Sequence, residues 1–267
     1  MKYFLLHTVL FIPFVTISQP NNLAVAKVSY TLKYMQDTSF KNNFREEQFL
    51  LFVGNSFTHY FSYEKYLQDS IAKKQMEKQL KDGFDNVVIG NSKRYTPIEL
   101  YYDISNKSLF VQNSILKKYL YNDSCHIINW HITDERKKFD KYNCTKAVGT
   151  FRGRDYIAWF TNEIPIPAGP WKLNGLPGLI LEAYDTQNQV QFLFNGIESI
   201  TNQSISLRPN LTEVIEVSKK DFIALQKIVT SDPIGYLNAN SNFKMNPNLK
   251  PIRSLKKAPN PVELTEN

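Results

Sequence analysis

Apolar and polar residues alternate along several stretches of this chain, which is the pattern of half-buried β-strands. The first stretch begins at Lys27 with KVSYTLKYM, and the second, EEQFLLFVGN, ends at Gly54-Asn55, with SFTHYFSYE leading out of it. Four more follow with Asn, Asp and Ser between them, namely YTPIELYYDIS, KSLFVQNSI, LKKYLYNDS and HIINWHIT. Their regular spacing predicts short strands in antiparallel pairing.

Two segments change to the helical period. From Tyr63, EKYLQDSIAKKQMEKQLKDG brings its apolar residues near one face and reaches Gly83, a residue type that ends helices. Its many charges predict a long surface helix, laid across a sheet or acting as a lid. Near the C-terminus, SKKDFIALQKIVTSDP places Ser218 and Asp221 in N-cap relation and ends before Pro233, which predicts a shorter helix.

The middle of the chain predicts two hairpins. In the first, strands from Lys146 to Phe151 and from Tyr156 to Thr161 flank a turn at Arg152-Gly153-Arg154. In the second, LILEAYD and VQFLFNGIES flank the loop from Asp185 to Gln189. Between the hairpins, Pro165-Ile166-Pro167 cannot form a central strand, because two of its three residues lack the N–H donor.

The glycine-rich stretch GPWKLNGLPGLILEAYD, Gly169 to Asp185, lies between these hairpins. Asn174-Gly175 is a strong turn pair, and Leu176-Pro177-Gly178-Leu179 fits a type II turn in which Gly178 has a positive φ. Phosphate-binding loops place their glycines at the start of a helix, whereas these run into a β pattern. Turn architecture is therefore favoured, and a backbone-lined ligand or partner site remains the alternative.

Composition agrees with a packed β-rich domain. The chain has 267 residues, of which 42% are hydrophobic and 13% aromatic, enough to fill a core. We predict a mainly β (α+β) fold over residues 19–245, with a single antiparallel curved sheet or partial barrel, one long surface helix and a short C-terminal helix. Residues 246–267 are rich in Pro, Lys and Asn, which predicts a flexible tail.

The N-terminus, MKYFLLHTVLFIPFVTIS, has the layout of a secretory signal peptide over residues 1–18. A membrane anchor is the alternative, but the apolar run is shorter than the about 20 residues that span a bilayer and is broken by Pro13. We therefore expect export to the periplasm or cell envelope, or secretion, with no transmembrane span in the mature chain. The net charge of +7 is spread among acids, as in TDERKKFDK, so nucleic acid is not an expected partner.

Cys125 and Cys144 would both belong to the mature protein, where an exported chain can keep a disulfide. If HIINWHIT and FDKYNC form a hairpin around the polar DERKK, Cys144 faces roughly Asn129 and not Cys125. A direct bridge would need a tight turn at Asp134-Glu135 or a different pairing, because the two Cα atoms must lie within about 7 Å. A disulfide and two separate buried thiols both remain open.

No recognisable set of catalytic groups is present. The sequence contains no G-x-S-x-G, no H-E-x-x-H and no C-x-x-C, and Cys144 sits in a strand pattern typical of a buried structural thiol. His126 and His131 are an odd number of residues apart, so on one strand they point to opposite faces. Glu163, Glu182 and Asp185 cluster only in sequence. We predict no catalytic residue, metal or cofactor.

The run GLPGLI, Gly175 to Ile180, with AWFTNEIPIPAGPWKLN before it and LEAYD after it, resembles the signature of the GLPGLI family, also called Porph_ging, of exported proteins from Bacteroidota. Trp130, the segment from Cys144 to Ala147, Gly153-Arg154 and the segment from Asn260 to Leu264 resemble that family too. The resemblance implies an envelope or secreted location and one β-rich domain. The biochemical role of the family is not established, so the resemblance transfers no catalytic residues.

These observations favour a non-enzymatic envelope protein that binds a partner protein or an apolar or peptide ligand. Its predicted binding rim consists of Trp159, Phe160, Pro165, Pro167, Trp171 and Leu176, next to the motif turn of Asn174, Gly175, Pro177 and Gly178. The alternatives are a hydrolase, such as a peptidase or glycan-active enzyme, whose residues converge only in the fold, and a purely structural envelope component.

Overall fold

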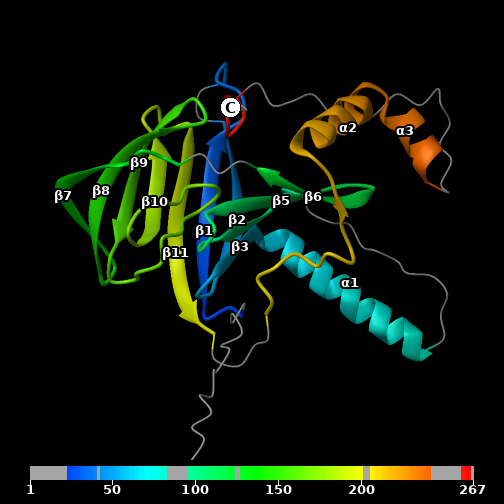
Figure 1. The fold of residues 1–267 in the computed structure, drawn as a ribbon, viewed down its shortest axis with the longest axis horizontal. Helices are drawn as coiled ribbons and strands as arrows, with labels where there is room; N and C mark the ends of the chain where they lie inside the picture. Colours follow the sequence, from blue (N-terminus) through cyan, green and yellow to red (C-terminus); the bar gives the residue numbers. More distant parts are fainter. Residues whose placement is uncertain are drawn as a thin grey trace, which may run out of the picture.

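The computed structural model describes residues 23–40, 43–82, 95–123, 127–200, 205–241 and 260–265, with residues 79–82 as backbone alone. Its main feature is one sheet of twelve strands (Figure 1). The strands are β1 (Ala26–Met35), β2 (Phe44–Val53), β3 (Phe57–Ser62), β4 (Glu99–Asp103), β5 (Ser108–Ile115), β6 (Lys117–Asp123), β7 (His131–Phe139), β8 (Tyr142–Phe151), β9 (Arg154–Thr161), β10 (Leu179–Asp185), β11 (Val190–Ser199) and β12 (Ile215–Glu216).

Two antiparallel meanders make up the sheet. Its strand order is β12-β6-β5-β4-β3-β2-β1-β11-β10-β9-β8-β7, so the first meander runs from β1 to β6 and the second from β7 to β11. They meet where β1 pairs with β11 in antiparallel register, with Leu32 opposite Phe192. The short β12 is parallel to β6. The mainly β, antiparallel prediction is confirmed, and the sheet stays open, so it is not closed into a barrel.

The strand β3 was not predicted, because the sequence analysis took SFTHYFSYE as a connection. Five of the six residues of β3 are buried, which removes the alternation of apolar and polar residues that marks a half-exposed strand. Aromatic residues pack on both of its sides. Tyr60 belongs to the larger core cluster, while its neighbour Phe61 belongs to a smaller one.

These two clusters define the two faces of the sheet. The inner face carries the larger cluster, with Tyr30, Leu100 and Phe192 among its members, and the segment between β9 and β10 packs against it. The outer face carries the smaller cluster of Ala24, Leu50, Phe52, Phe57, Phe61 and Leu207. Side chains of successive strand residues point to opposite faces, so neighbours along β2, β3 and β4 serve different faces.

Within the described part of the chain there are three helices, where the sequence predicted two: α1 (Tyr63–Asp82), α2 (Lys219–Ser231) and α3 (Pro233–Asn240). Ser218 caps α2 by accepting the N–H of Asp221, as predicted. The expectation that the first helix lies across the sheet is wrong, since α1 runs away from it (Figure 1) and Ile71 and Met76 are exposed. None of these three helices is long and apolar enough to cross a membrane.

The predicted hairpin around DERKK is also wrong. β7 runs through that polar sequence, pairs with β8 and places Lys137 opposite Cys144, instead of Asn129. β7 is the last strand of the sheet, and charged residues are typical of such edge strands because they discourage pairing with other chains. Cys144 carries a free thiol and is fully buried. Because its thiol is free, Cys144 does not form the possible bridge to Cys125, which itself lies outside the described residues.

Candidate functional site

The six residues of the predicted binding rim do not form one exposed surface. Trp159, Phe160 and Leu176 are buried in the larger core cluster, so their aromatic and apolar side chains serve packing. Pro165 is exposed, while Pro167 and Trp171 are half-buried. The expectation of a common rim is therefore wrong for the three buried residues.

The motif turn has a different geometry from the one predicted. Gly175 has a φ of +91°, which suits the predicted turn pair, and Asn174 is buried with its Nδ2 donating to the carbonyl of Lys172 at 3.0 Å. Gly178, however, does not have a positive φ, so the predicted type II turn is wrong. A Cβ at Gly178 would lie 2.0 Å from the carbonyl oxygen of Thr161. This glycine, next to the exposed Pro177, is needed for close approach of two backbones.

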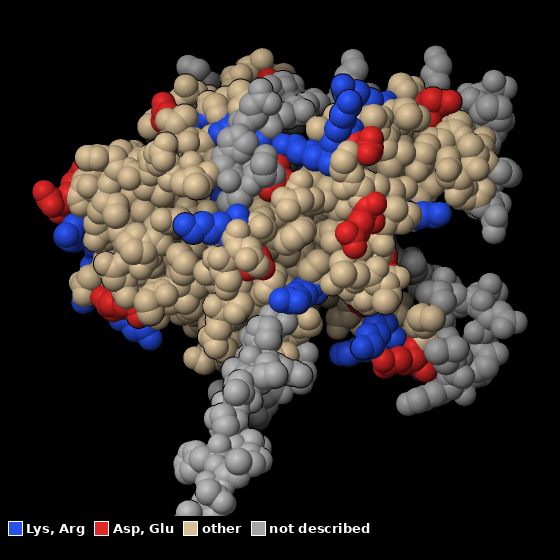
Figure 2. Space-filling view, viewed as in Figure 1, with Lys and Arg blue, Asp and Glu red and all other residues tan. Residues whose placement is uncertain are grey.

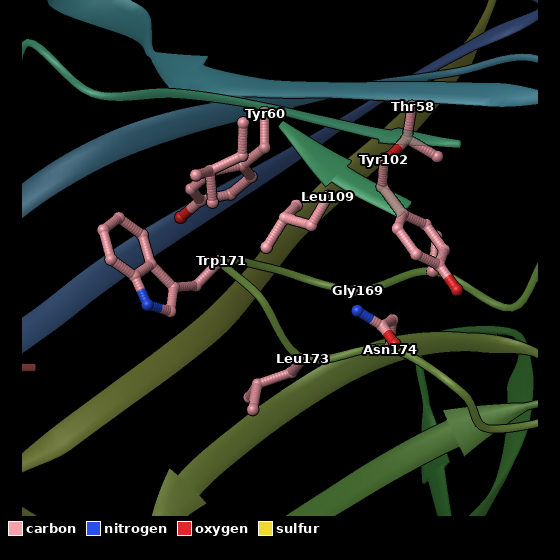
Figure 3. A pocket seen from close by; sticks show the side chains of 10 residues that line it. Thr58, Tyr60, Tyr102, Leu109, Gly169, Trp171, Leu173 and Asn174 are labelled. Atoms are coloured by element: carbon pink, nitrogen blue, oxygen red, sulfur yellow. The ribbon is translucent and has the colours of Figure 1, made fainter. Parts of the chain in front are cut away.

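The segment that carries the motif covers the inner face of the sheet. Figure 3 shows Trp171, Leu173 and Asn174 on this segment facing Tyr60 and Leu109 from the strands. The cavity between them measures about 10 Å³, which is about the room that one water molecule needs. An organic ligand does not fit there. At the edge of this segment, Trp171 and Lys172 bond to Glu263.

The C-terminal residues 260–265 lie against that edge. They were expected to belong to a flexible tail, and that expectation is wrong for this short segment. The N–H groups of Leu264 and Thr265 donate to the carbonyl of Arg152 at 3.0 and 3.2 Å. Arg152 and Gly153 form the turn between β8 and β9 with φ of 49° and 80°, a two-residue turn typical of hairpins. A Cβ at Gly153 would lie 3.1 Å from the Cβ of Leu264, so the glycine lets the segment approach.

Arg154 holds the segment with its whole guanidinium group. Its Nη2 donates to Asn260 Oδ1 and to the carbonyl of Pro261, both at 2.6 Å, and its Nε donates to the carbonyl of Val262 at 3.0 Å. Its Nη1 donates to the carboxylate of Asp185 at 2.6 Å, which fixes the guanidinium from the opposite side. Arg154 and Asp185 are both buried. Charge-assisted hydrogen bonds of this kind are roughly twice as strong as neutral ones.

Further hydrogen bonds hold the C-terminal segment at Asn260 and Glu263. The Asn260 side chain donates from Nδ2 to the carbonyl of Met35 at 2.7 Å, and its backbone N–H donates to the carbonyl of Gln36 at 3.0 Å. Glu263 Oε1 accepts from Trp171 Nε1 and from Lys172 Nζ, both at 2.8 Å. We call this set, Met35, Gln36, Arg152, Gly153, Arg154, Trp171 and Lys172, the clamp.

A buried carboxylate supports the clamp from below. Asp123, at the end of β6 and 1% exposed, accepts from Lys172 Nζ at 2.7 Å, Lys219 Nζ at 2.8 Å and Arg152 Nη2 at 3.1 Å. Burial by itself would raise the pKa of Asp123, but these cations outweigh it and lower the pKa to about 2. Because Lys219 begins α2, this carboxylate ties β6, the clamp and the C-terminal helices together.

Sequence reasoning missed most of the clamp. From the sequence, Arg154 was expected only in a turn and in the family resemblance, and Glu263 only in that resemblance. No site was predicted at Asp123 or Lys172. Their partners lie far away in sequence, and Arg154 and Asn260 are 106 positions apart. On the face drawn in Figure 2, acidic and basic side chains are interspersed, so charge alone does not mark the site.

The described residues contain neither a metal-binding group nor a reactive cysteine. No three His, Cys, Asp or Glu side chains in the described ranges come together as metal ligands. Burial, with a smaller contribution from Glu163, raises the pKa of the Cys144 thiol to about 11. A thiol with that pKa is protonated near neutral pH and is a poor nucleophile.

Comparison with solved structures shows a shared fold. Two structures of PNGF-II are similar to this chain, in the P21 and C2 space groups, with TM-scores of 0.49 and 0.51 and 14% sequence identity in both cases. Each match covers 76% of this chain and 33% or 32% of the other, so this chain matches about a third of their length. No curated protein sequence matches the chain.

One family does match, over a short part of the chain that contains most of the clamp. Residues 152–182 match the model described as "Protein of unknown function (Porph_ging)". The matched stretch includes Arg152, Arg154, Trp171 and Lys172, together with the motif turn. The resemblance to the Porph_ging family is thereby confirmed, and the stretch that carries it is the one that holds the C-terminal segment.

Proposed function

We propose that this protein is an exported binding protein of the cell envelope whose clamp recognises an extended peptide segment with the pattern Asn-Pro-x-Glu. Residues 260–265 are the occupant from the same chain. A segment of a partner protein with the same pattern would occupy the clamp in their place. This proposal narrows the binding role expected from the sequence to peptide recognition and moves its site from the aromatic rim to Arg154 and its neighbours.

The contacts of Arg154 carry the proposal. Two of its hydrogen bonds go to backbone carbonyls of the segment, and a third goes to the Asn260 side chain. Carbonyl contacts recognise any extended peptide, whereas the Asn260 and Glu263 contacts select the sequence.

A hydrolase is the alternative that the sequence left open. Two carboxylates, Asp69 and Glu99, line a pocket on the outer face together with His59. Both carboxylates bind the Lys65 ammonium, and the pKa of Glu99 is lowered to about 2. A glycosidase acid must be protonated near neutral pH, so Glu99 does not suit that role. Binding is therefore the function we favour.

Peptide binding in trans tests the proposal. The full-length mature chain with Asn260→Ala and Glu263→Ala loses the side-chain anchors of its own segment, so its clamp should accept a labelled peptide, APNPVELTEN. We expect the wild type to bind this peptide at least about tenfold more weakly, since its own segment competes at high effective concentration. Fluorescence anisotropy gives both affinities, and thermal melting shows whether the variant stays folded.

Matched controls separate sequence-specific recognition from non-specific peptide binding. The same peptide with Ala in place of the residues that correspond to Asn260 and Glu263 should not bind the double variant. Adding Trp171→Phe, which removes the indole N–H that donates to Glu263, should weaken peptide binding by about tenfold to a hundredfold, as expected for a hydrogen bond to a charged group. Equal binding of the two peptides would contradict the proposed function.

A further inference from the structure

A second pocket lies on the outer face of the sheet, away from the clamp. It measures about 320 Å³ and lies where β2, β3, β4, the first turns of α1 and residues 205–206 come together. Its lining combines aromatic rings with charged groups: Phe52, His59, Phe61, Lys65, Tyr66, Asp69, Glu99, Ile205 and Ser206. A volume of this size suits a small organic molecule.

Glu99 fixes the orientation of His59 in this pocket. Glu99 Oε2 accepts from Tyr101 at 3.1 Å and bonds to His59 Nε2 at 2.9 Å, while its Oε1 accepts from Gln112 at 2.8 Å. An ionised carboxylate can only accept, so His59 Nε2 must carry the hydrogen and donate. The neutral imidazole then offers Nδ1 as an acceptor, which bonds to no residue in the described part of the chain.

Charge in the pocket favours a cation. Lys65 Nζ lies 3.2 Å from Glu99 and also pairs with Asp69, so one positive group faces two negative ones. Burial would raise the pKa of Glu99, but His59 and Lys65 outweigh it and keep the carboxylate ionised. Burial lowers the pKa of His59, which keeps the imidazole neutral near pH 7. The Asp69 side chain is 62% exposed, so an incoming cation can reach it.

Aromatic rings complete the lining. The His59 ring lies 4.4 Å from the Phe61 ring and 4.1 Å from the Tyr101 ring, and the Phe61 ring lies 6.0 Å from the Tyr66 ring. Tyr66 is 43% exposed although it borders a pocket. Aromatic faces attract cations and pack against flat apolar molecules.

We infer that this outer pocket binds a small organic ammonium compound with a flat apolar body. The ammonium lies near Asp69 and donates to His59 Nδ1, and the apolar body packs on Tyr66, Phe61 and Phe52. The negative balance of charge, the free acceptor and the aromatic walls are each complementary to such a ligand. The inference does not depend on peptide binding by the clamp.

Two small molecules of similar shape and opposite charge test whether the outer pocket binds an ammonium compound. Phenethylamine and phenylacetate share their ring, so their difference in affinity reports the charge preference of the pocket. We expect saturable binding of phenethylamine by the full-length mature protein, measured by titration calorimetry or NMR chemical shifts, and binding of phenylacetate at least about tenfold weaker. Asp69→Asn and Tyr66→Ala should each weaken phenethylamine binding by about threefold to thirtyfold, as cation–π and ion-pair energies suggest.

Glu77→Gln is the matched control, because it removes a carboxylate from the exposed part of α1 outside the pocket lining. It should leave phenethylamine binding unchanged. The inference is overturned if phenethylamine does not bind at millimolar concentration, if phenylacetate binds as well, or if Glu77→Gln weakens binding as much as Asp69→Asn. Asp69 and Tyr66 lie on the partly exposed helix, so both variants should fold, which a melting curve verifies.

Discussion

The two faces of the sheet use their charged groups in opposite ways. On the inner face, Asp123 and Arg154 are buried, and they hold together segments from four distant parts of the chain. The cavity beside them holds no more than a water molecule. On the outer face, Glu99 holds His59 and Lys65 at the wall of a pocket of about 320 Å³.

This difference shows what buried charge does in each place. Around the clamp, the charged groups already bond to one another and to the C-terminal segment. A ligand can therefore bind there only by displacing that segment. Around the outer pocket, the buried carboxylate of Glu99 orients His59 and Lys65, which line the pocket wall. The next four predictions test the contrast, from the largest expected effect on stability to the smallest.

Asp123→Asn should give the largest loss. It leaves Arg152, Lys172 and Lys219 around a site without its compensating charge, and breaking a buried ion pair in this way typically costs about 3–5 kcal/mol. Urea denaturation measures the free energy of unfolding. Asp134→Asn, on the exposed edge strand β7, is the control and should change it by less than about 0.5 kcal/mol. Equal effects of the two variants would contradict the structural role of Asp123.

Gly178→Ala should come next, with a loss of about 2–3 kcal/mol, because the added methyl group would overlap the Thr161 carbonyl. Gly175→Ala is its partner in the same motif. No atom lies within 4 Å of a Cβ there, and the cost of about 1–2 kcal/mol comes from the positive φ alone. Thermal or urea unfolding of both variants would show the order, and a reversed order would contradict the close backbone contact at Gly178.

Acid should weaken the fold through both buried carboxylates. The pKa of Glu99 falls from its ordinary 4.5 to about 2, and that of Asp123 from 3.8 to about 2. A carboxyl with a lowered folded-state pKa adds stability that is fully present above the unfolded-state value and is lost as pH falls through the folded-state value. Unfolding free energies measured from pH 5 to pH 2 should therefore decrease, and Asp123→Asn should flatten the decrease. If the unfolding free energy of Asp123→Asn fell with pH as steeply as that of the wild type, Asp123 would not be a source of the acid sensitivity.

Asp69→Asn should have the smallest effect on stability, below about 1 kcal/mol, because the Asp69 side chain is 62% exposed and Lys65 keeps Glu99 as a second partner. The comparison predicts that this residue matters for ligand binding and hardly for folding. Urea denaturation at neutral pH gives the value, with Glu77→Gln as the reference. A loss as large as that of Asp123→Asn would remove the distinction between the two faces.

Local sequence signals predicted much of the sheet. The turn at Arg152-Gly153 and the loop from Asp185 to Gln189 were placed correctly, because turn residues and alternation act over a few residues. The Ser218 cap was also placed correctly. β3 and β7 were missed for opposite reasons. β3 is buried on both sides, so its polar residues do not mark a solvent-exposed face, while β7 is an exposed edge strand whose only apolar residues are Ile132 and Phe139.

The candidate sites could not be predicted in the same way. Their residues have ordinary neighbours in sequence, and each acquires its role from a partner brought close by the fold. His59 meets Glu99 across 40 residues, because β3 and β4 pair in the sheet. Lys172 meets Asp123 across 49 residues, because the motif segment crosses the inner face above β6.

The sequence by itself determined most of the strands and turns, a capped C-terminal helix and the resemblance to the Porph_ging family, since these depend on propensities and patterns within short windows. Tertiary structure alone decided which aromatic residues became core, which charges were buried, and that the end of the chain returns to Arg154. The physical reason is that desolvation and ion pairing depend on what surrounds a side chain in space.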